Sequence, residues 1–139
     1  MTGGPIVIVE DDLDDQELYA EALHVLEIPN PIHFFNDGKQ ALDYLSTTEE
    51  QPFIILSDIN MPGMTGLELK KYIHDDAYLS AKGIPFVFIS TSVNPVSIRH
   101  AHALSVQGYF EKPSQMERIK VMLRRLFDYW EHCKHINNT

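Results

Sequence analysis

The sequence has few of the features that mark disulfide-bonded, membrane-spanning or nucleic-acid-binding proteins. Cys133 is the single cysteine, which excludes an intrachain disulfide. No apolar run approaches the roughly 20 residues that a transmembrane helix needs, and no basic-then-apolar leader precedes the first apolar segment. Basic residues are also scarce, because 11 Lys and Arg stand against 20 Asp and Glu. Duplex binding depends on Lys and Arg, so we expect no nucleic-acid partner. Because the apolar run and the leader are lacking, we expect a cytoplasmic protein with no membrane partner.

The composition that remains is that of one globular domain. The chain has 139 residues, of which 44% are hydrophobic and 22% charged, and this length suits a single domain with a buried core. We expect the domain to span residues 5–133 and a tail to span residues 134–139. The formal charge of −9 suits a cation site or a basic partner.

Five short apolar segments predict strands, at residues 6–9, 32–35, 53–56, 86–89 and 109–110. Three of them lack polar alternation, which is typical of parallel strands that helices cover on both faces. Segments with helical spacing lie between them, and the last helix is predicted from residues 114–117 as a capping box and from an apolar stripe of Met116, Ile119, Leu123, Leu126 and Trp130. The order β-α, repeated five times, predicts an α/β domain with a doubly wound, parallel, five-stranded sheet.

Polar side chains stand where these strands end, and a sheet of this kind binds its ligands outside the carboxyl ends of its strands. They are Glu10, Asp11, Asp12, Ser57, Asp58, Ser90, Thr91, Ser92, Glu111 and Lys112. Carboxylates crowded together repel one another unless a cation lies among them, and Mg²⁺ prefers such oxygen ligands. For Asp14 and Asp15 we favour a different role, in which they stabilise the positive N-terminus of the first helix.

Four motifs in this order resemble the signature of response-regulator receiver domains, the CheY-like proteins. They are residues 8–12 (IVEDD), residues 58–66 (DINMPGMTG), Ser90 and residues 108–113 (GYFEKP), and the match runs from about residue 6 to residue 130. The resemblance implies the flavodoxin-like strand order 2-1-3-4-5. It also implies a two-component phosphorelay, in which a sensor histidine kinase or a phosphotransfer protein donates a phosphoryl group.

The resemblance assigns a role to each residue of the acidic site. Asp58 is the implied phospho-acceptor, and the implied Mg²⁺ ligands are Asp11, Asp58 and the backbone carbonyl of Asn60, with Glu10 bound through a water molecule. Phosphoryl transfer needs a nucleophile in line and positive charge near the phosphoryl oxygens, which the metal and Lys112 would supply. Asp12 either supports the acidic pair from behind or caps the first helix.

The resemblance also implies a switch. Ser90 is the hydroxyl expected to turn toward the phosphoryl oxygens, with Thr91 as the alternative, and Tyr109 is the aromatic side chain expected to follow it. A plain aromatic of the strand is the other interpretation of Tyr109. Thr91 stands where a very small residue is common, which predicts a longer-lived phosphorylated state. The peptide bond between Lys112 and Pro113 is expected to be cis.

The expected output is protein contact, because the residues after Lys112 suffice for only one helix and a tail. The resemblance places this contact with a downstream protein, or with a second copy in a homodimer, on the face formed by the fourth helix, the fifth strand and the last helix. For Leu126 and Trp130 core packing is the alternative. The long link at residues 74–83 is similar to that of single-domain receivers paired with phytochrome-like kinases.

Three other functions fit less well. A phosphatase with an aspartate nucleophile needs a carboxylate two residues later, where this chain has Asn60, so we do not expect an enzyme. A receiver-like binding module that is never phosphorylated usually lacks an acidic residue or the lysine, and both are present here. A nucleotide binder would have its phosphates repelled by the acidic residues 10–12.

Overall fold

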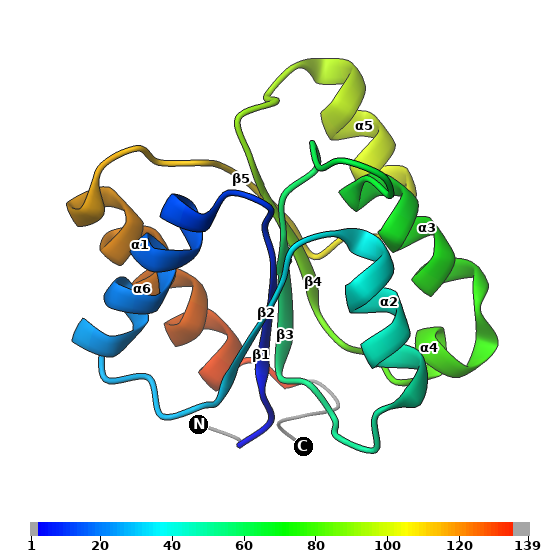
Figure 1. Cartoon of the computed structure of the whole chain (residues 1–139), viewed down its shortest axis with the longest axis horizontal. Helices are drawn as coiled ribbons and strands as arrows, with labels where there is room; N and C mark the ends of the chain where they lie inside the picture. Colours follow the sequence, from blue (N-terminus) through cyan, green and yellow to red (C-terminus); the bar gives the residue numbers. More distant parts are fainter. Residues whose placement is uncertain (1–2, 135–139) are drawn as a thin grey trace.

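The five predicted strands form one parallel sheet in the computed structural model, which describes residues 3–134 (Figure 1). The elements are β1 (Ile6–Val9), α1 (Leu13–Val25), β2 (Ile32–Phe35), α2 (Gly38–Thr47), β3 (Ile54–Ser57), α3 (Gly66–Asp75), α4 (Ala77–Ala81), β4 (Phe86–Ser90), α5 (Pro95–Ala103), β5 (Gly108–Glu111) and α6 (Met116–His132). The strand order is β2-β1-β3-β4-β5 and every pairing is parallel, which confirms the predicted fold and order. Apart from Lys134, the expected tail at residues 134–139 lies outside the described residues.

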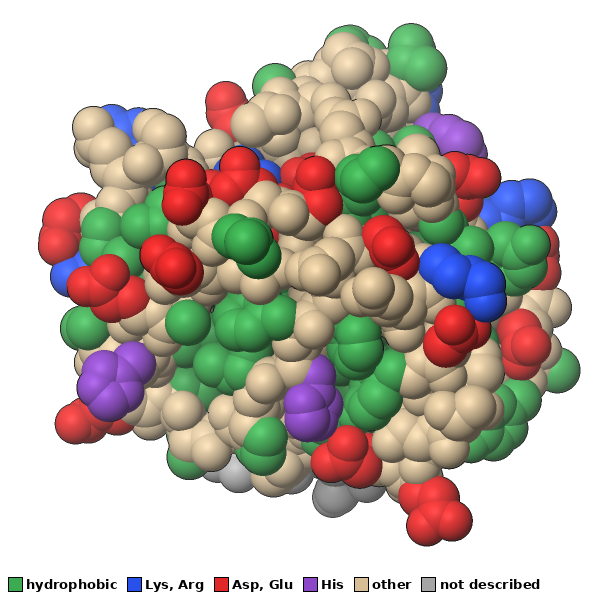
Figure 2. All heavy atoms as spheres, viewed as in Figure 1, with side chains coloured by type: hydrophobic (Ala, Val, Ile, Leu, Met, Phe, Trp, Pro, Cys, Tyr) green, Lys and Arg blue, Asp and Glu red, His purple; other side chains and the backbone are tan. Residues whose placement is uncertain are grey.

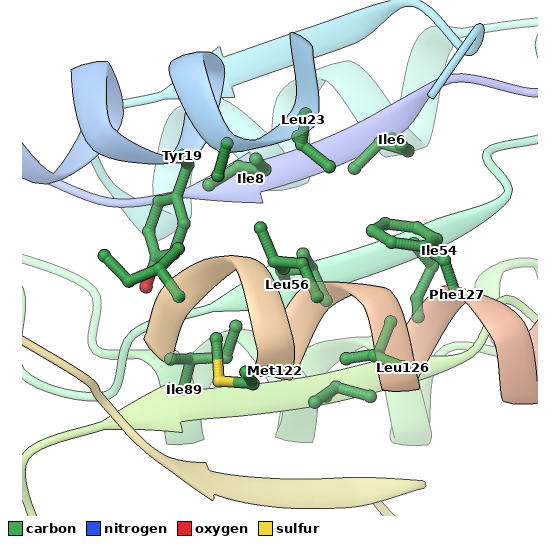
Figure 3. Packing of buried hydrophobic residues seen from close by; sticks show 14 of the residues in the cluster. Ile6, Ile8, Tyr19, Leu23, Ile54, Leu56, Ile89, Met122, Leu126 and Phe127 are labelled. Carbon is green, nitrogen blue, oxygen red and sulfur yellow. The ribbon is translucent and has the colours of Figure 1, made fainter. Parts of the chain in front are cut away.

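Helices cover both faces of the sheet, and each face has its own core. Helices α1 and α6 lie on one side, and α2, α3, α4 and α5 lie on the other (Figure 1). Successive side chains of a strand point to opposite faces, so Ile6 and Ile8 join the first core while Val7 and Val9 join the second. Figure 3 shows the first core, where Phe127 of α6 lies against the sheet. Burial of both faces explains why the central strands lack polar alternation.

The structure adds one helix to the predicted order and corrects one predicted cap. The link at residues 74–83 contains the short helix α4, capped by Asp76, whose side chain accepts a hydrogen bond from the Leu79 N–H at 3.0 Å. The expected capping box at residues 114–117 does not form, because α6 begins one residue later than that box requires and its N-cap, Gln115, makes no side-chain capping bond. Within the described residues, every helix is too short or too polar to span a bilayer.

A capping box does form at the start of α3, where the sequence analysis did not predict one. The Thr65 hydroxyl accepts a hydrogen bond from the Glu68 N–H at 3.2 Å, and the Glu68 carboxylate accepts one from the Thr65 N–H at 3.1 Å. This box ends the loop that follows Asp58. The box therefore helps to hold the end of the loop beside the acidic site in place.

We expect Thr65→Ala to lower the free energy of unfolding by about 1 kcal/mol, because it leaves an N-terminal N–H of α3 without its acceptor. Urea denaturation monitored by circular dichroism measures the change. Gln115→Ala at the N-cap of α6 is the matched control and should change the stability little, since Gln115 makes no capping bond. Equal losses in the two variants would contradict the assignment.

Candidate functional site

The candidate site lies at the carboxyl edge of the sheet, where β1, β3, β4 and β5 all end. The strand order reverses at β1, which has β2 on one side and β3 on the other, and such a reversal opens a crevice between the loops that leave the two central strands. Glu10 and Asp11 follow β1, and Asp58 follows β3. Figure 2 shows acidic side chains gathered on the surface above the end of β1. The topology therefore brings together the residues that the sequence analysis selected.

Three carboxylates form the centre of the site. Glu10, Asp11 and Asp58 each offer an oxygen atom, and these atoms lie within 4.8 Å of one another. Glu10 and Asp58 are buried while Asp11 is exposed. Carboxylates packed this closely favour a divalent cation between them, and the donor set contains only the hard oxygen atoms that Mg²⁺ or a similar ion prefers. The residues present therefore fit a metal that enters from the solvent side.

Lys112 joins this cluster from the end of β5. Its ammonium nitrogen lies 2.7 Å from Glu10 Oε1, 2.9 Å from Asp58 Oδ2 and 3.0 Å from Asp15 Oδ2. Burial alone would lower the pKa of Lys112, but the hydrogen bonds to the three carboxylates outweigh burial and raise that pKa above its ordinary value. The lysine is thus a fixed positive charge at the edge of the sheet.

Asp15 is a residue whose place in the site the sequence analysis missed. It was expected only to stabilise the start of α1, as its neighbour Asp14 does from an exposed position. Instead, its carboxylate turns inward to Lys112. A signal for this was present, because Asp15 precedes the buried Tyr19 by one helical turn and so lies on the same face of α1.

Asp12 acts in two ways. Its side chain accepts hydrogen bonds from the N–H groups of Asp14 at 2.8 Å and Asp15 at 3.2 Å, so it caps α1. Its own N–H donates to Glu10 Oε2 at 3.1 Å. Burial raises the pKa of Glu10, and the hydrogen bonds from Lys112 and from the Asp12 N–H oppose that rise. The capping alternative therefore holds for the side chain of Asp12, while its backbone supports the acidic pair.

The Asp58 side chain is held by hydrogen bonds and is buried, though not completely. Its N–H donates to the carbonyl of Val9 at 3.0 Å, which continues the β1–β3 pairing, and its Oδ1 accepts from the Ile59 N–H at 2.7 Å. The side chain is 10% exposed. The Ile59 N–H and the Lys112 ammonium therefore orient the two oxygens of this carboxylate, and a small part of the side chain remains exposed to solvent.

The loop after β4 connects three further site residues through Ser92. The Ser92 N–H donates to Ser90 Oγ at 3.1 Å, its hydroxyl accepts from Asn60 Nδ2 at 2.7 Å, and its carbonyl accepts from the Tyr109 hydroxyl. Ser90 is fully buried whereas Thr91 is exposed, which favours Ser90 over the alternative. Ser92 was named as a polar residue after the fourth strand but was given no role, although its position two residues after Ser90 was a signal for one.

The expected cis peptide bond was wrong. Among the described residues no peptide bond is cis, so the bond between Lys112 and Pro113 is trans. Pro leaves only a small energy difference between the isomers, and the expectation rested on the resemblance alone. The trans bond still leaves the ammonium of Lys112 in contact with Asp58.

A doubly wound sheet that carries an acidic trio and a lysine at its carboxyl edge defines the class of receiver domains. The comparison with known families agrees: the sequence model of the "Response regulator receiver domain" matches residues 6–124. The chain therefore belongs to the response regulator receiver family, whose members are signalling modules of two-component systems.

Individual relatives cover nearly the whole chain. The chain is 32% identical over 129 residues to the probable methanogenesis regulatory protein FilR2 of Methanothrix harundinacea, covering 90% of this chain and 82% of that protein. Its structure resembles that of the phosphorylated cyanobacterial phytochrome response regulator RcpA, with a TM-score of 0.85, 30% identity, and 96% and 97% of the two chains covered. It also resembles the Mn²⁺-bound form of response regulator Rcp1, a protein of Synechocystis sp., with a TM-score of 0.81, 26% identity, and 95% and 97% covered. The chain is thus similar to the phytochrome-associated, CheY-like single domains that the sequence analysis indicated.

Proposed function

We propose that this protein is a phosphorylation switch that accepts a phosphoryl group on Asp58 from a sensor histidine kinase or a phosphotransfer protein. The observation that supports this most is the meeting of Asp58, Lys112, Glu10 and Asp11, which follow the ends of three different strands, at one edge of the sheet. The bond formed joins an Asp58 carboxylate oxygen to phosphorus, and the bond broken joins that phosphorus to the nitrogen of the donor histidine.

The residues around Asp58 fit the demands of this transfer. The Ile59 N–H holds one Asp58 oxygen, and the Lys112 ammonium faces the other at 2.9 Å, so the nucleophile is oriented and positive charge lies where the phosphoryl oxygens would gather. Asp11, Asp58 and the carbonyl of Asn60 would hold Mg²⁺, with Glu10 bound through water. The bound cation would supply further positive charge to the phosphoryl oxygens.

The signal would pass from Asp58 through Ser90 to the surface. A phosphoryl group adds a charge of roughly −2 and favours conformers that turn Ser90 and Lys112 toward it. Movement of Ser90 would act on Ser92, and Ser92 holds the Tyr109 hydroxyl. The proposed contact face, formed by α5, β5 and α6, would then present a changed surface to a downstream protein or to a second copy.

Side chains on that face fall into two groups. Leu126 is 3% exposed and belongs to the core, and Trp130 is partly buried against the same core, so both residues pack as the core-packing interpretation predicted. Tyr129 is 63% exposed and borders a groove of about 290 Å³ between β5 and α6, which Trp130 and Phe110 also line. Tyr129 and the groove are therefore the features available to a partner. Both lie within the domain bounds of residues 5–133 that we propose.

The test is incubation with Mg²⁺ and acetyl phosphate, followed by measurement of the intact mass. We expect the wild type to gain the mass of one phosphoryl group, and the gain to vanish in the presence of EDTA. Asp58→Asn keeps the shape of the side chain and must show no gain. An unmodified wild type would favour the inert binding module, and sustained phosphate release over many turnovers would favour a phosphatase.

Metal binding can be tested without phosphorylation. We expect Mg²⁺ at about one hundred times its Kd to stabilise the wild type against thermal unfolding by about 2.7 kcal/mol, and Asp11→Asn to remove most of this gain. Scanning calorimetry with and without Mg²⁺ measures it. Asp43→Asn is the control, because Asp43 pairs with Lys39 on the surface and is 64% exposed. Equal stabilisation of the Asp11 variant and the wild type would argue against the site.

A further inference from the structure

Lys112 has one partner, Asp15, that lies outside the two motifs that supply the metal ligands and the phospho-acceptor. Asp15 Oδ2 lies 3.0 Å from Lys112 Nζ, and the Asp15 side chain is 29% exposed. The Asp12 cap fixes the Asp15 backbone through the hydrogen bond to its N–H at 3.2 Å, and Tyr19 anchors the same face of α1 in the core beside Ile8 (Figure 3). The geometry of α1 therefore directs this carboxylate at the lysine.

The three N–H donors of Lys112 match three carboxylates. An ammonium group has three donors and no acceptor, and its partners here are Glu10, Asp58 and Asp15. Among the described carboxylates, those that could share a metal ion are Glu10, Asp11 and Asp58, and Asp15 is outside that group. Asp15 thus contacts the lysine without being one of the candidate metal ligands.

We propose that Asp15 is a positioning residue that limits how much of the positive charge of Lys112 reaches a phosphoryl group on Asp58. The proposal rests on the function proposed for Asp58. In this role, Asp15 in the first turn of α1 acts on Lys112 and thereby influences the rate of phosphoryl transfer to Asp58.

The direction of the effect follows from what each carboxylate does during the transfer. Once Asp58 carries the phosphoryl group, the hydrogen bond that Lys112 donated to Asp58 goes to a phosphoryl oxygen instead. Glu10, 2.7 Å away, still orients the ammonium, so the lysine does not need Asp15 to stay in place. Asp15 keeps a negative charge on the ammonium, which weakens its attraction for the phosphoryl oxygens, and it repels an anionic donor. Removing that charge should therefore speed the transfer.

The experiment compares Asp15→Asn with Asp14→Asn. Both changes remove one negative charge from the first turn of α1, but Asp14 is exposed and is not among the three carboxylates that pair with Lys112. At saturating Mg²⁺ with acetyl phosphate, we expect Asp15→Asn to be phosphorylated about three to ten times faster than the wild type. Asp14→Asn should stay within about twofold of it, and Asp15→Glu should restore a rate near that of the wild type.

A double-mutant cycle shows whether Asp15 acts through the lysine. In a Lys112→Met background, Asp15→Asn should no longer speed phosphorylation more than Asp14→Asn does. The proposal is overturned if Asp15→Asn is no faster than Asp14→Asn, or if its advantage persists without the lysine. A merely structural role would lower the stability and leave this coupling near zero.

A titration with Mg²⁺ alone separates this proposal from the function proposed for Asp58. Without Asp15 the lysine repels the incoming cation more strongly, so isothermal titration calorimetry should give Asp15→Asn an Mg²⁺ affinity about threefold weaker than that of Asp14→Asn. If the wild type accepts no phosphoryl group, the proposed function fails, while this difference in affinity still supports the contact. Equal affinities would overturn the charge-limiting role.

Discussion

Replacing Lys112 by methionine is expected to slow the phosphorylation of Asp58 by acetyl phosphate by about two to three powers of ten. Methionine keeps most of the length and apolar surface of the side chain and removes the ammonium. The transfer then loses a positive charge that lies 2.9 Å from the nucleophile, and the remaining carboxylates face an anionic donor without it. Mg²⁺ should bind the variant more tightly, because the competing cation is gone.

Lys70→Met is the control for this variant. Lys70 is also buried, at 7% exposure, but it lies on α3 with its ammonium 5.7 Å from the centre of the Phe86 ring. Burial lowers the pKa of Lys70, so its replacement removes an unfavourably buried charge and should leave the rate of phosphorylation unchanged. Time courses of intact mass at saturating Mg²⁺ give both rates. A similar slowing in the two variants would mean that the loss at Lys112 reflects damage to the fold.

The sequence could predict the site wherever a residue's role depends on its position at the end of a strand. The apolar strands β1 and β3 fix where the chain reaches the carboxyl edge of a parallel sheet, so Glu10, Asp11 and Asp58 follow from the strand pattern and the topology alone. For these residues, the position of the strands in the sequence determines where the side chains lie.

Residues outside the strand ends were harder to predict, because their orientation depends on tertiary packing. Asp14 and Asp15 are equivalent as helix-start carboxylates, and only the packing of α1 on the sheet, through Tyr19, turns one outward and the other toward Lys112. Two of the contacts of Ser92, to Ser90 and to Tyr109, are made by its backbone, and a backbone contact leaves no mark on the residue type. The start of α6 was misplaced by one residue, enough to remove the expected capping box.

The second large effect is expected at Gly66, where Gly66→Ala should lower the free energy of unfolding by about 3 kcal/mol. A Cβ atom there would lie 2.0 Å from the backbone carbonyl oxygen of Asp58 and 2.9 Å from Cε1 of Phe88. The first neighbour is backbone and cannot rotate away. The Gly66 N–H also donates to the carbonyl of Ile59 at 2.9 Å, so the loop that carries Asp58 is tied to the first residue of α3.

The change at Gly66 should affect stability and chemistry together. Either α3 moves away from the sheet, which opens the second core, or the backbone of Asp58 shifts and carries the carboxylate away from Lys112. Urea denaturation measures the first effect, and the phosphorylation rate of the folded protein measures the second. Gly3→Ala is the control, because a Cβ at Gly3 meets nothing within 4 Å. If Gly66→Ala unfolds at the same urea concentration as this control, the close approach of α3 to Asp58 does not limit the stability of the fold.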